Sequence, residues 1–539
     1  MFCISALYAQ EVTTKNGILK GVVEDEVAVF KGIPFAAAPL GALRWKAPMP
    51  SKPWTGVRMS DKFSPICMQT GMYPKDSPIE EMSEDCLYLN IWKPEKTDTK
   101  KLPVMLWFYG GGLVNGSAST NLYSGENLAK QNVIVITANY RLGALGFLAH
   151  PELSKEADYK SSGNYGLLDM IAVLHWVQEN IESFGGDPNN VTIFGQSSGA
   201  ISISALIASP LTKGLFHKAI GQSGGLFEPI ELDKGFSLPT LEQAGVRFAT
   251  RAGASNLKKL RDIPAEDLLK FPVHTSMNID GYVLKQSPFD AYKNNEYNKV
   301  SVLLGNTMIE GQEFISDLKI TKESYRNELG KHFPSWLVLL TAPNPGKTDY
   351  EALEAAISFE GDVRFKWNMW TWAKLASNEK DNRVYFYQFA KSPPYPSDSG
   401  RAGWGATHGS DLYYVFGNLD QRKWAWTEDD YRLSSAMVRY WTNFAKYGNP
   451  NGQNLPLWPE FSIKSPKAMY LDLNTKSNTL NAERTLSKLD SIYSVARFIT
   501  KNYIILILVA ISLFSYMTFS IVKRVRKRRI KTKINFKDY

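Results

Sequence analysis

The chain has 539 residues, of which 44% are hydrophobic, 12% aromatic and 21% charged, so its composition is that of a globular protein and excludes a disordered or fibrous one. The formal net charge of +9 is concentrated in segment 523–539, which holds nine Lys or Arg and one Asp. The remaining 522 residues are close to neutral. Because the body carries almost no net positive charge, unlike typical nucleic-acid-binding domains, we expect no nucleic-acid partner.

The first residues, MFCISALYAQ, contain an apolar run and a candidate cleavage position after Ala9, although no basic segment precedes the run. We interpret residues 1–9 as the remnant of a signal peptide. Loss of Cys3 with that peptide would leave Cys67 and Cys86 as an even pair of cysteines. In an oxidising compartment such a pair favours a disulfide, with two buried thiols as the alternative.

Short apolar runs rich in β-branched and aromatic residues alternate with helical stretches through the body. Strands are predicted at 103–110, 132–141, 191–194, 218–223, 299–305 and 384–390. Helices are predicted at 166–184, 198–206 and 435–448. This alternation predicts an α/β fold with a large, mainly parallel central sheet and helices on both faces. Two connections are too long for bare crossovers, and we expect helical insertions there, at 226–298 and 314–380.

The pattern G-x-S-x-G, typical of a nucleophile elbow, occurs twice, centred on Ser197 and on Ser223. An elbow requires a strand that enters a sharp turn and a helix that leaves it. Ser197 has both, since VTIF precedes it and SGAISISALIAS comes directly after it. After Ser223 comes GGLFEPIELDKG, whose glycines and proline disfavour a helix. We therefore predict Ser197 as the nucleophile and Ser223 as a strand-end residue without an elbow.

A serine nucleophile needs a histidine base and a carboxylate that orients the base, and α/β hydrolases carry them in the chain order Ser, acid, His. His408 fits this order, in a loop of small residues, GWGATHGSDLYYVFG, that could present an imidazole to a cleft. Glu310 is predicted as the acid because it lies just after the strand at 299–305, with Glu313 as the alternative. The other histidines fit less well by order or by predicted position: His150, His175, His217, His274 and His332.

A glycine-rich loop at the end of an earlier strand supplies the oxyanion donors in this fold class. The stretch FYGGGL places Gly110, Gly111 and Gly112 directly after the apolar run PVMLWF. Together these motifs predict acyl transfer on a small-molecule ester, chemistry that requires no metal and no other cofactor.

The chain resembles the type B carboxylesterase/cholinesterase family over about residues 15–490, and it looks like a membrane-anchored, carboxylesterase-like member. The similar stretches are FKGIPFAAAPLGALRW, SEDCLYLNIW, PVMLWFYGGGL, ANYRLGALGFL, GNYGLLDMIAVLHWVQENIESFGGDPNNVTIFGQSSGA, FHKAIGQSGG, GNTMIEGQEF, HGSDLYYVFG and RYWTNFAKYGNPN. The resemblance implies the α/β-hydrolase fold and a serine carboxylic-ester hydrolase that acts through an acyl-enzyme. A homodimer is left open.

The same resemblance assigns roles to individual residues. It implies Ser197 as nucleophile, Glu310 as acid and His408 as base. In this family the serine of the QSG stretch lies near the acid, so we expect Ser223 to be a buried hydrogen-bond donor to Glu310.

Backbone and disulfide positions carry over in the same way. The resemblance implies an oxyanion hole formed by the amides of Gly111, Gly112 and Ser198. It also pairs Cys67 with Cys86 across a short loop.

Two departures from the family bear on the substrate. Where cholinesterases carry a choline-binding Trp this chain has Asp76, and where most members carry Glu before the nucleophile it has Gln196. Both changes remove attraction for a quaternary ammonium, so we expect uncharged, hydrophobic esters and disfavour choline esters. Juvenile-hormone-esterase-like members also carry Gln before the nucleophile, as this chain does at Gln196. After the nucleophile they usually carry Ala, where this chain has Ser198. A neuroligin-like adhesion protein is the alternative class, which the complete set of catalytic positions disfavours.

Segment 503–522, YIILILVAISLFSYMTFSIV, has no charge and no proline, and it is long enough to cross a bilayer as a helix. Because the basic segment 523–539 should stay cytosolic, we predict a single-pass type I membrane protein with an extracellular or lumenal hydrolase domain at 10–497. Two glycosylation sequons, at Asn115 and Asn190, adjoin the predicted motifs, and we expect both to be buried.

Overall fold

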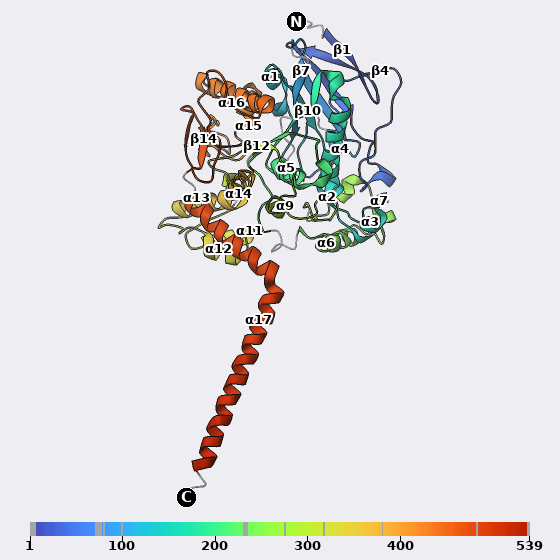
Figure 1. The fold of residues 1–539 in the computed structure, drawn as a ribbon. Helices are drawn as coiled ribbons and strands as arrows, with labels where there is room; N and C mark the ends of the chain where they lie inside the picture. Colours follow the sequence, from blue (N-terminus) through green and yellow to red (C-terminus); the bar gives the residue numbers. More distant parts are fainter. Residues whose placement is uncertain are drawn as a thin grey trace.

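The computed structural model describes residues 7–70, 78, 81–98, 101–229, 236–273, 276–315, 318–379, 381–480 and 483–535 (Figure 1). Its strands are β1 (Leu7–Thr14), β2 (Gly17–Glu24), β3 (Val27–Pro34), β4 (Val57–Met59), β5 (Ile66–Cys67), β6 (Met82–Ser83), β7 (Tyr88–Pro94), β8 (Leu102–Phe108), β9 (Ile134–Ala138), β10 (Gly186–Gln196), β11 (Lys218–Gln222), β12 (Ser301–Thr307), β13 (Val384–Phe389), β14 (Lys467–Leu471) and β15 (Lys476–Thr479).

The α-helices are α1 (Glu126–Ala129), α2 (Gly143–Phe147), α3 (Pro151–Glu156), α4 (Tyr165–Asn180), α5 (Ser198–Ala208), α6 (Leu238–Arg251), α7 (Leu257–Asp262), α8 (Ala265–Leu268), α9 (Pro288–Lys293), α10 (Gln312–Ile315), α11 (Tyr325–His332), α12 (Ser335–Thr341), α13 (Asp349–Gly361), α14 (Trp367–Ala376), α15 (Leu412–Val415), α16 (Glu428–Tyr447) and α17 (Glu483–Asn535).

One large sheet organises the body. Within the described residues it has thirteen strands, in the order β1-β2-β3-β7-β9-β8-β10-β11-β12-β13-β14-β15, with β4 paired to β2. The strands from β9 to β14 in this order are parallel, whereas β1, β2, β3, β7 and β15 join antiparallel at the two edges. The expected α/β-hydrolase architecture is confirmed, as a mixed sheet with a parallel centre.

The strands predicted in the body all form, and they make up most of the parallel centre. β8 and β9 are buried along their whole length, because helices cover both faces of the sheet. A strand covered on both faces is a continuous apolar run in the sequence. One boundary differs: the breaker GGDPNN was expected to separate a helix from the strand VTIF, but all of it except Gly185 belongs to β10, which begins at Gly186. The antiparallel strands before residue 95 were not predicted, although β1, β2, β3 and β7 fill that region.

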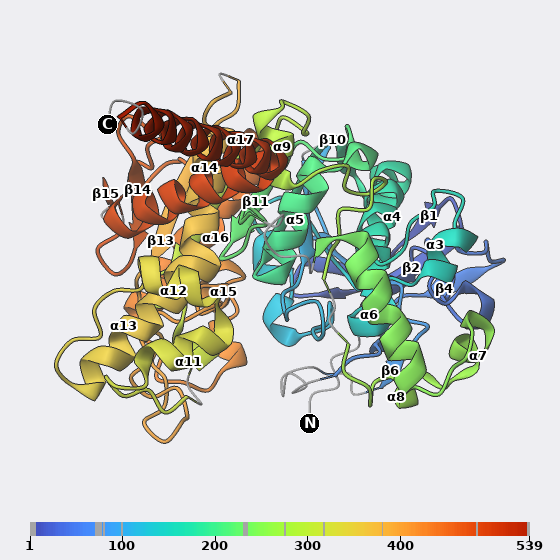
Figure 2. The ribbon, with the colours of Figure 1, turned by 90° about the horizontal axis from the view of Figure 1, so that it is seen from below.

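Both long connections contain helices, as expected. The first carries α6 to α9 and the second carries α11 to α14. Seen from below, α6, α7 and α8 lie on one side of the body and α11, α12 and α13 on the other (Figure 2).

The expected disulfide forms between Cys67 and Cys86. The two sequons differ from expectation, because Asn115 and Asn190 are part-exposed rather than buried. Asn190 lies in β10, whose first residues extend beyond the covered part of the sheet. At the N-terminus, β1 begins at Leu7, so cleavage after Ala9 would fall inside a strand.

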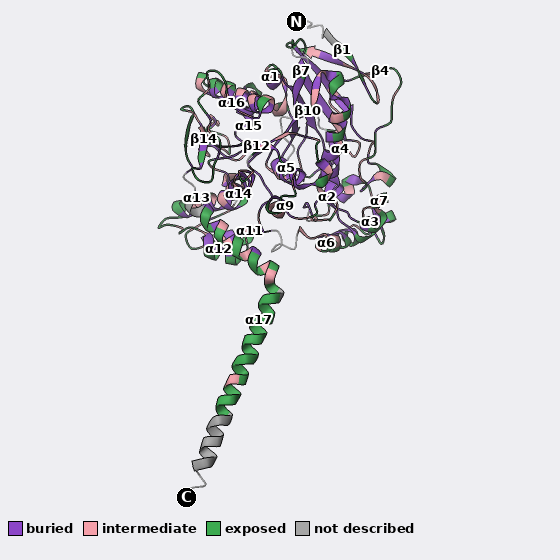
Figure 3. Ribbon diagram, in the orientation of Figure 1, coloured by how far each residue is buried: buried purple, intermediate pink, exposed green. Residues whose placement is uncertain are grey.

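The C-terminal helix α17 is continuous over 53 residues. Its stretch Ile505–Val525 is long and apolar enough to cross a membrane and is not buried against the described part of the body, and it overlaps the predicted segment 503–522. Figure 1 shows this part leaving the body, and Figure 3 shows its surface exposed. The first part of α17 packs on the body, since Leu489 and Tyr493 are buried.

Candidate active site

The two G-x-S-x-G motifs lie side by side at the carboxyl ends of neighbouring strands. In the parallel register of β10 and β11, Gly195 pairs with Gly221 and Gln196 with Gln222. The amide of Ser197 donates to Gln222 O (2.9 Å), and in the same way the amide of the next strand's serine, Ser223, donates to Gly305 O of β12 (2.8 Å). The repeat in the sequence therefore becomes a repeat in space, one strand apart.

Of the two serines, only Ser197 lies in a sharp turn between a strand and a helix. Ser197 has φ 55° and ψ −128°, a conformation that L-residues rarely adopt, and α5 begins at the next residue. The two glycines that flank it are required by close packing, because a Cβ on Gly195 would lie 2.7 Å from Phe108 O and one on Gly199 would lie 2.1 Å from the same oxygen. Ser223 also has a positive φ of 52°, but the described residues directly after it, 224–229, are not helical.

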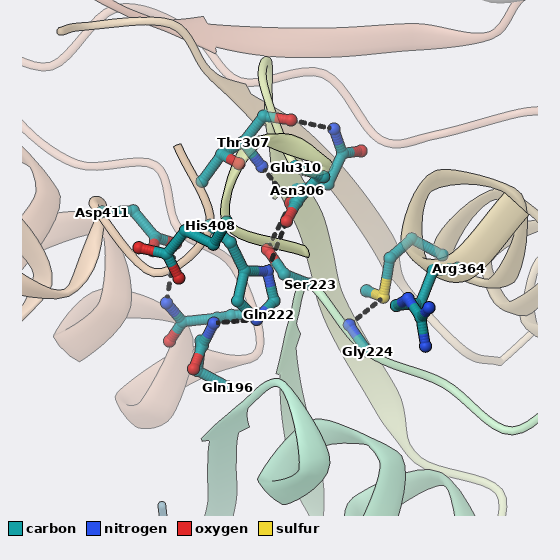
Figure 4. A network of polar contacts seen from close by, with 12 residues as sticks. Gln196, Gln222, Ser223, Gly224, Asn306, Thr307, Glu310, Arg364, His408 and Asp411 are labelled. Carbon is teal, nitrogen blue, oxygen red and sulfur yellow. Dashed lines mark hydrogen bonds and ion pairs between the residues drawn. The ribbon is translucent and has the colours of Figure 1, made fainter. Parts of the chain in front are cut away.

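The predicted acid and base form a hydrogen-bonded pair near the end of β12. His408 Nδ1 lies 2.5 Å from Glu310 Oε2 (Figure 4). The other carboxylate oxygen, Oε1, accepts from Ser223 Oγ (2.6 Å) and from the amide of Thr307 (2.6 Å). Glu310 and Ser223 have no exposed surface. The alternative acid, Glu313, is instead paired with Arg401 (2.6 Å).

The electrostatics of the pair favour an imidazolium beside a carboxylate. Burial alone would lower the pKa of His408, but the charge of Glu310 and the hydrogen bond to it, helped by Glu313 and Asp411, raise that pKa above 6.5. Burial would likewise raise the pKa of Glu310, yet the His408 charge and its hydrogen bond, with the donors from Ser223 and Thr307, hold that pKa below 4.5. The site is therefore suited to stabilise positive charge on the histidine ring.

The residue before the nucleophile candidate contacts the predicted base, His408. Gln196 Nε2 lies 3.0 Å from His408 Nε2 (Figure 4). Because Glu310 accepts the proton on Nδ1, the neutral ring presents its lone pair at Nε2, and the Gln196 amide donates to it. Within the described residues Ser197 Oγ makes no hydrogen bond to His408, so in this conformation Gln196 holds the position that a serine proton donor would take.

Most of the remaining histidines have structural contacts elsewhere. His150 Nδ1 caps α3 by accepting from the amide of Glu152 (3.2 Å), and His217 Nδ1 accepts from the amide of Val191 (3.2 Å). His332 Nδ1 lies 3.2 Å from Glu360. His175 is exposed on α4, and His274 and the substrate-related Asp76 lie outside the described residues.

The three predicted oxyanion amides lie in the turn after β8 and at the start of α5. Gly111 and Gly112 have φ values of 112° and 63°, which a side chain would strain. In the described part of the chain, none of the amides of Gly111, Gly112 and Ser198 has a hydrogen-bond acceptor. The hydroxyl of Ser198 accepts from the amide of Leu113 (3.2 Å), which holds the glycine turn against the first turn of α5.

The disulfide loop supports the same glycine turn. Gln69, two residues beyond Cys67, accepts from the amide of Gly116 (2.9 Å) and donates to Gly116 O (3.0 Å). The disulfide to Cys86 anchors that segment to the chain just before β7. A covalent link thereby helps to fix the loop that carries Gly111 and Gly112.

Some residues around the site were not predicted from the sequence. The rings of Phe314 and Phe365 pack against His408 at centroid distances of 5.3 and 4.3 Å. Asp411, in the same HGSD motif as His408, accepts from Gln222 (2.9 Å; Figure 4). It also accepts from Tyr387 (2.8 Å). The sequence did contain a sign of this contact between Gln222 and Asp411, because Gln222 lies in the second GQS repeat and Asp411 in the HGSD motif. Within the described residues, no group of three or more His, Cys, Asp or Glu side chains is arranged to hold a metal ion.

A serine on a strand–turn–helix, next to a buried carboxylate–imidazole pair on the same sheet, is the arrangement of an α/β hydrolase. Comparisons with known proteins specify the class further. A match to the carboxylesterase family covers residues 8–490. Fumonisin B1 esterase of Sphingopyxis macrogoltabida is 38% identical over 460 residues, which cover 83% of this chain and 84% of that protein.

Further relatives agree. Carboxylesterase 5A of Canis lupus familiaris is 36% identical over 484 residues, covering 83% of this chain and 82% of that protein. The solved structure of a thermophilic PNB esterase matches with a TM-score of 0.78 at 33% identity, covering 89% of this chain and 99% of that one. The chain therefore belongs to the carboxylesterase family and is a carboxylic ester hydrolase.

Replacement of Ser223 by Ala removes one hydrogen bond to a buried carboxylate, which is worth about 1.5–3 kcal/mol. We expect kcat/KM to fall by about 10- to 100-fold and the free energy of unfolding to decrease. The matched control is Ser60→Ala, since Ser60 is equally buried and its hydroxyl has no partner among the described residues. Steady-state kinetics and thermal melting check this; a Ser223→Ala variant that behaves like the control would exclude a role for the hydroxyl.

Replacement of Gln196 by Glu places a negative charge beside His408 Nε2 and should raise the pKa of His408 further. A protonated ring cannot accept a proton, so activity falls as the pH drops through this pKa. The acid limb of the kcat/KM–pH profile should therefore move to higher pH in the variant, with activity recovered on the alkaline side. An acid limb that stays in place, or a wild-type profile that is flat down to about pH 4, contradicts this role of His408.

Proposed function

We propose that the enzyme hydrolyses uncharged, hydrophobic carboxylic esters through an acyl-enzyme on Ser197, with His408 as general base and Glu310 as the carboxylate that orients it. The observation that carries this proposal is the hydrogen-bonded Glu310–His408 pair, beside the one serine of the two motifs that precedes a helix. The complete set of catalytic positions also distinguishes the chain from an adhesion protein that has lost its chemistry.

In the first step Ser197 Oγ attacks the ester carbonyl as His408 Nε2 takes its proton. Gln196 must first release Nε2, so the proposal includes a small side-chain movement that exchanges one donor for another. The imidazolium that forms is stabilised by Glu310. The alcohol leaves with the proton from His408, and an acyl group remains on Ser197.

The tetrahedral intermediate carries a negative oxygen that needs donors. The amides of Gly111, Gly112 and Ser198, which lack an acceptor among the described residues, are the proposed oxyanion hole. Each donor is worth roughly 3–4 kcal/mol by analogy with measured ones. In the second step a water molecule, activated by His408, attacks the acyl group and the acid is released. Ser223 takes part only through Glu310, whose charge and position it maintains.

The preference for uncharged, hydrophobic esters rests on the groups that surround the base. Phe314 and Phe365 place apolar rings beside His408. Gln196 supplies an amide where a carboxylate would attract a cation. Arg364, which lies over the ring of Phe314 at 5.1 Å, is neutralised by its ion pair with Glu360.

For the cellular setting, we propose that Ile505–Val525 crosses a membrane and that the hydrolase domain lies on its non-cytosolic side. The basic segment 523–539 would then be cytosolic. The Cys67–Cys86 disulfide is consistent with an oxidising compartment.

A fluorophosphonate probe tests the nucleophile directly, because it labels only an activated serine. We expect one labelled peptide, containing Ser197, and loss of labelling together with a fall in kcat on the order of 10⁴- to 10⁶-fold in Ser197→Ala. Ser223→Ala should still be labelled, more slowly. Labelling that persists in Ser197→Ala would refute this nucleophile, and a wild-type chain that is never labelled would favour the adhesion alternative.

A hydrolysis panel tests the substrate class. We expect kcat/KM to rise with acyl-chain length among neutral esters and to be lower for a choline ester than for the neutral ester of the same acid. The matched pair of a choline ester and its 3,3-dimethylbutyl analogue isolates the charge, since the two alcohols have nearly the same shape. A clear preference for the cationic member would overturn the proposal for uncharged substrates.

A further inference from the structure

The short helix α12 is apolar on both of its sides. Its sequence is SWLVLLT, and the side chains that face the body, Leu337 and Val338, are 3% and 2% exposed. The other apolar side chains point outward, with Trp336, Leu339 and Leu340 exposed by 40%, 65% and 50%. A surface helix that faces water normally carries polar residues on its outer side, so α12 is not fitted to an aqueous environment.

The outer side of α12 adjoins a second apolar surface, on the first part of α17. Trp336 and Leu340 line one shallow, almost entirely apolar depression together with Ile492, Val495 and Ile499. Along the same stretch of α17, Val495, Phe498 and Ile499 are 59%, 60% and 49% exposed. We call the exposed members of these two helices the α12 patch: Trp336, Leu339, Leu340, Val495, Phe498 and Ile499.

The patch has a fixed position because this part of α17 is held on the body. Tyr493 packs edge-on against Trp367 at 4.6 Å, and the guanidinium of Arg497 lies 3.5 Å above the ring of Phe289. An ion pair between Lys501 and Asp290 (2.5 Å) adds a contact shortly before the apolar span begins.

The patch also lies at the level that a bilayer surface would occupy. At 1.5 Å per residue, Ile499 and Val495 stand about 9 and 15 Å along the helix from Ile505, where the apolar span begins. A tilt of about 40° reduces these depths to about 7 and 11 Å, which brings Ile499 into the headgroup layer and leaves Val495 at its outer edge. The headgroup layer on each side of a bilayer is about 5–8 Å thick, and Trp and Tyr concentrate there. Figure 1 shows α12 at the end of the body from which the span leaves, and Figure 2 shows both helices on the same side of the body.

We infer that the α12 patch is a second membrane contact, which lies in the headgroup layer and holds the hydrolase domain against the bilayer. The inference rests on the proposed span of α17, with which the patch is continuous. Lipid is the occupant that fits best, because the patch begins where the span ends and its members are aliphatic or aromatic. The hydrolase domain would then be fixed in orientation on the membrane rather than free on a tether.

Site-directed spin labelling of the full chain in nanodiscs of phosphatidylcholine and phosphatidylserine tests this contact. In a Cys3→Ser background with the disulfide left oxidised, nitroxide is attached at Leu339→Cys. A label at Tyr447→Cys on α16, where the native side chain is 71% exposed, is the control for solvent. A label at Leu513→Cys is the control for the span. Collision rates with oxygen and with a water-soluble nickel chelate are compared.

At position 339 we expect higher oxygen accessibility and several-fold lower nickel accessibility than at position 447. Equal accessibility at 339 and 447, with position 513 shielded from nickel, would refute the patch and leave the span intact. Low accessibility to both reagents at 339 would mean that protein, such as a second copy, covers the patch, and would also refute it. Nickel access at 513 would refute the span and the patch together.

Introducing negative charges into the α12 patch gives an independent test of the membrane contact. The double variant Leu339→Glu with Leu340→Glu should raise nickel accessibility several-fold at a label on Ile499→Cys, because the body separates from the headgroups. Hydrolysis of a short, water-soluble ester should stay unchanged, since α12 packs mainly on α11 and α17, neither of which carries a proposed catalytic residue. Nickel accessibility that does not change would contradict the inference, whereas a failure of the esterase proposal would appear in the soluble assay.

Discussion

A carboxylate without exposed surface, Glu310, is the group on which the proposed active site depends. A buried charge is stable only when donors satisfy it, and here one oxygen accepts from Ser223 and Thr307 while the other accepts from His408. These donors come from the end of β11, the end of β12 and the loop that carries the base. The parallel register that aligns the carboxyl ends of the strands is therefore also the feature that keeps the acid charged.

The same register explains how one chain can use two copies of one motif. Ser197 and Ser223 occupy equivalent places on adjacent strands, with nearly equal positive φ, and differ in the structure of the next segment. The helix after Ser197 presents the amide of Ser198 at its first turn, suited to an oxyanion. The segment after Ser223 is not helical, and the Ser223 hydroxyl donates to Glu310 instead.

Much of the fold was predictable because the parallel strands are continuous apolar runs that periodicity and flanking glycines reveal. The N-terminal antiparallel strands were missed because neither strict alternation nor an unbroken apolar run marks them: in β2, GILKGVVE, Lys20 and Gly21 interrupt the apolar residues. At the site, motif order indicated Ser197, Glu310 and His408, since each comes after a recognisable strand or lies in a loop of small residues. The contact of Gln196 with the base, and the rings of Phe314 and Phe365, depend on how distant loops converge, which no local pattern encodes.

If Ser223 acts only by maintaining the charge and position of Glu310, its effect must disappear when that charge is removed. A double-mutant cycle on kcat/KM with Ser223→Ala and Glu310→Gln measures this dependence most directly. We predict that Ser223→Ala lowers kcat/KM in the wild-type background and has little further effect in Glu310→Gln. An equal cost in both backgrounds would contradict the buried, donor-dependent carboxylate as the centre of the site.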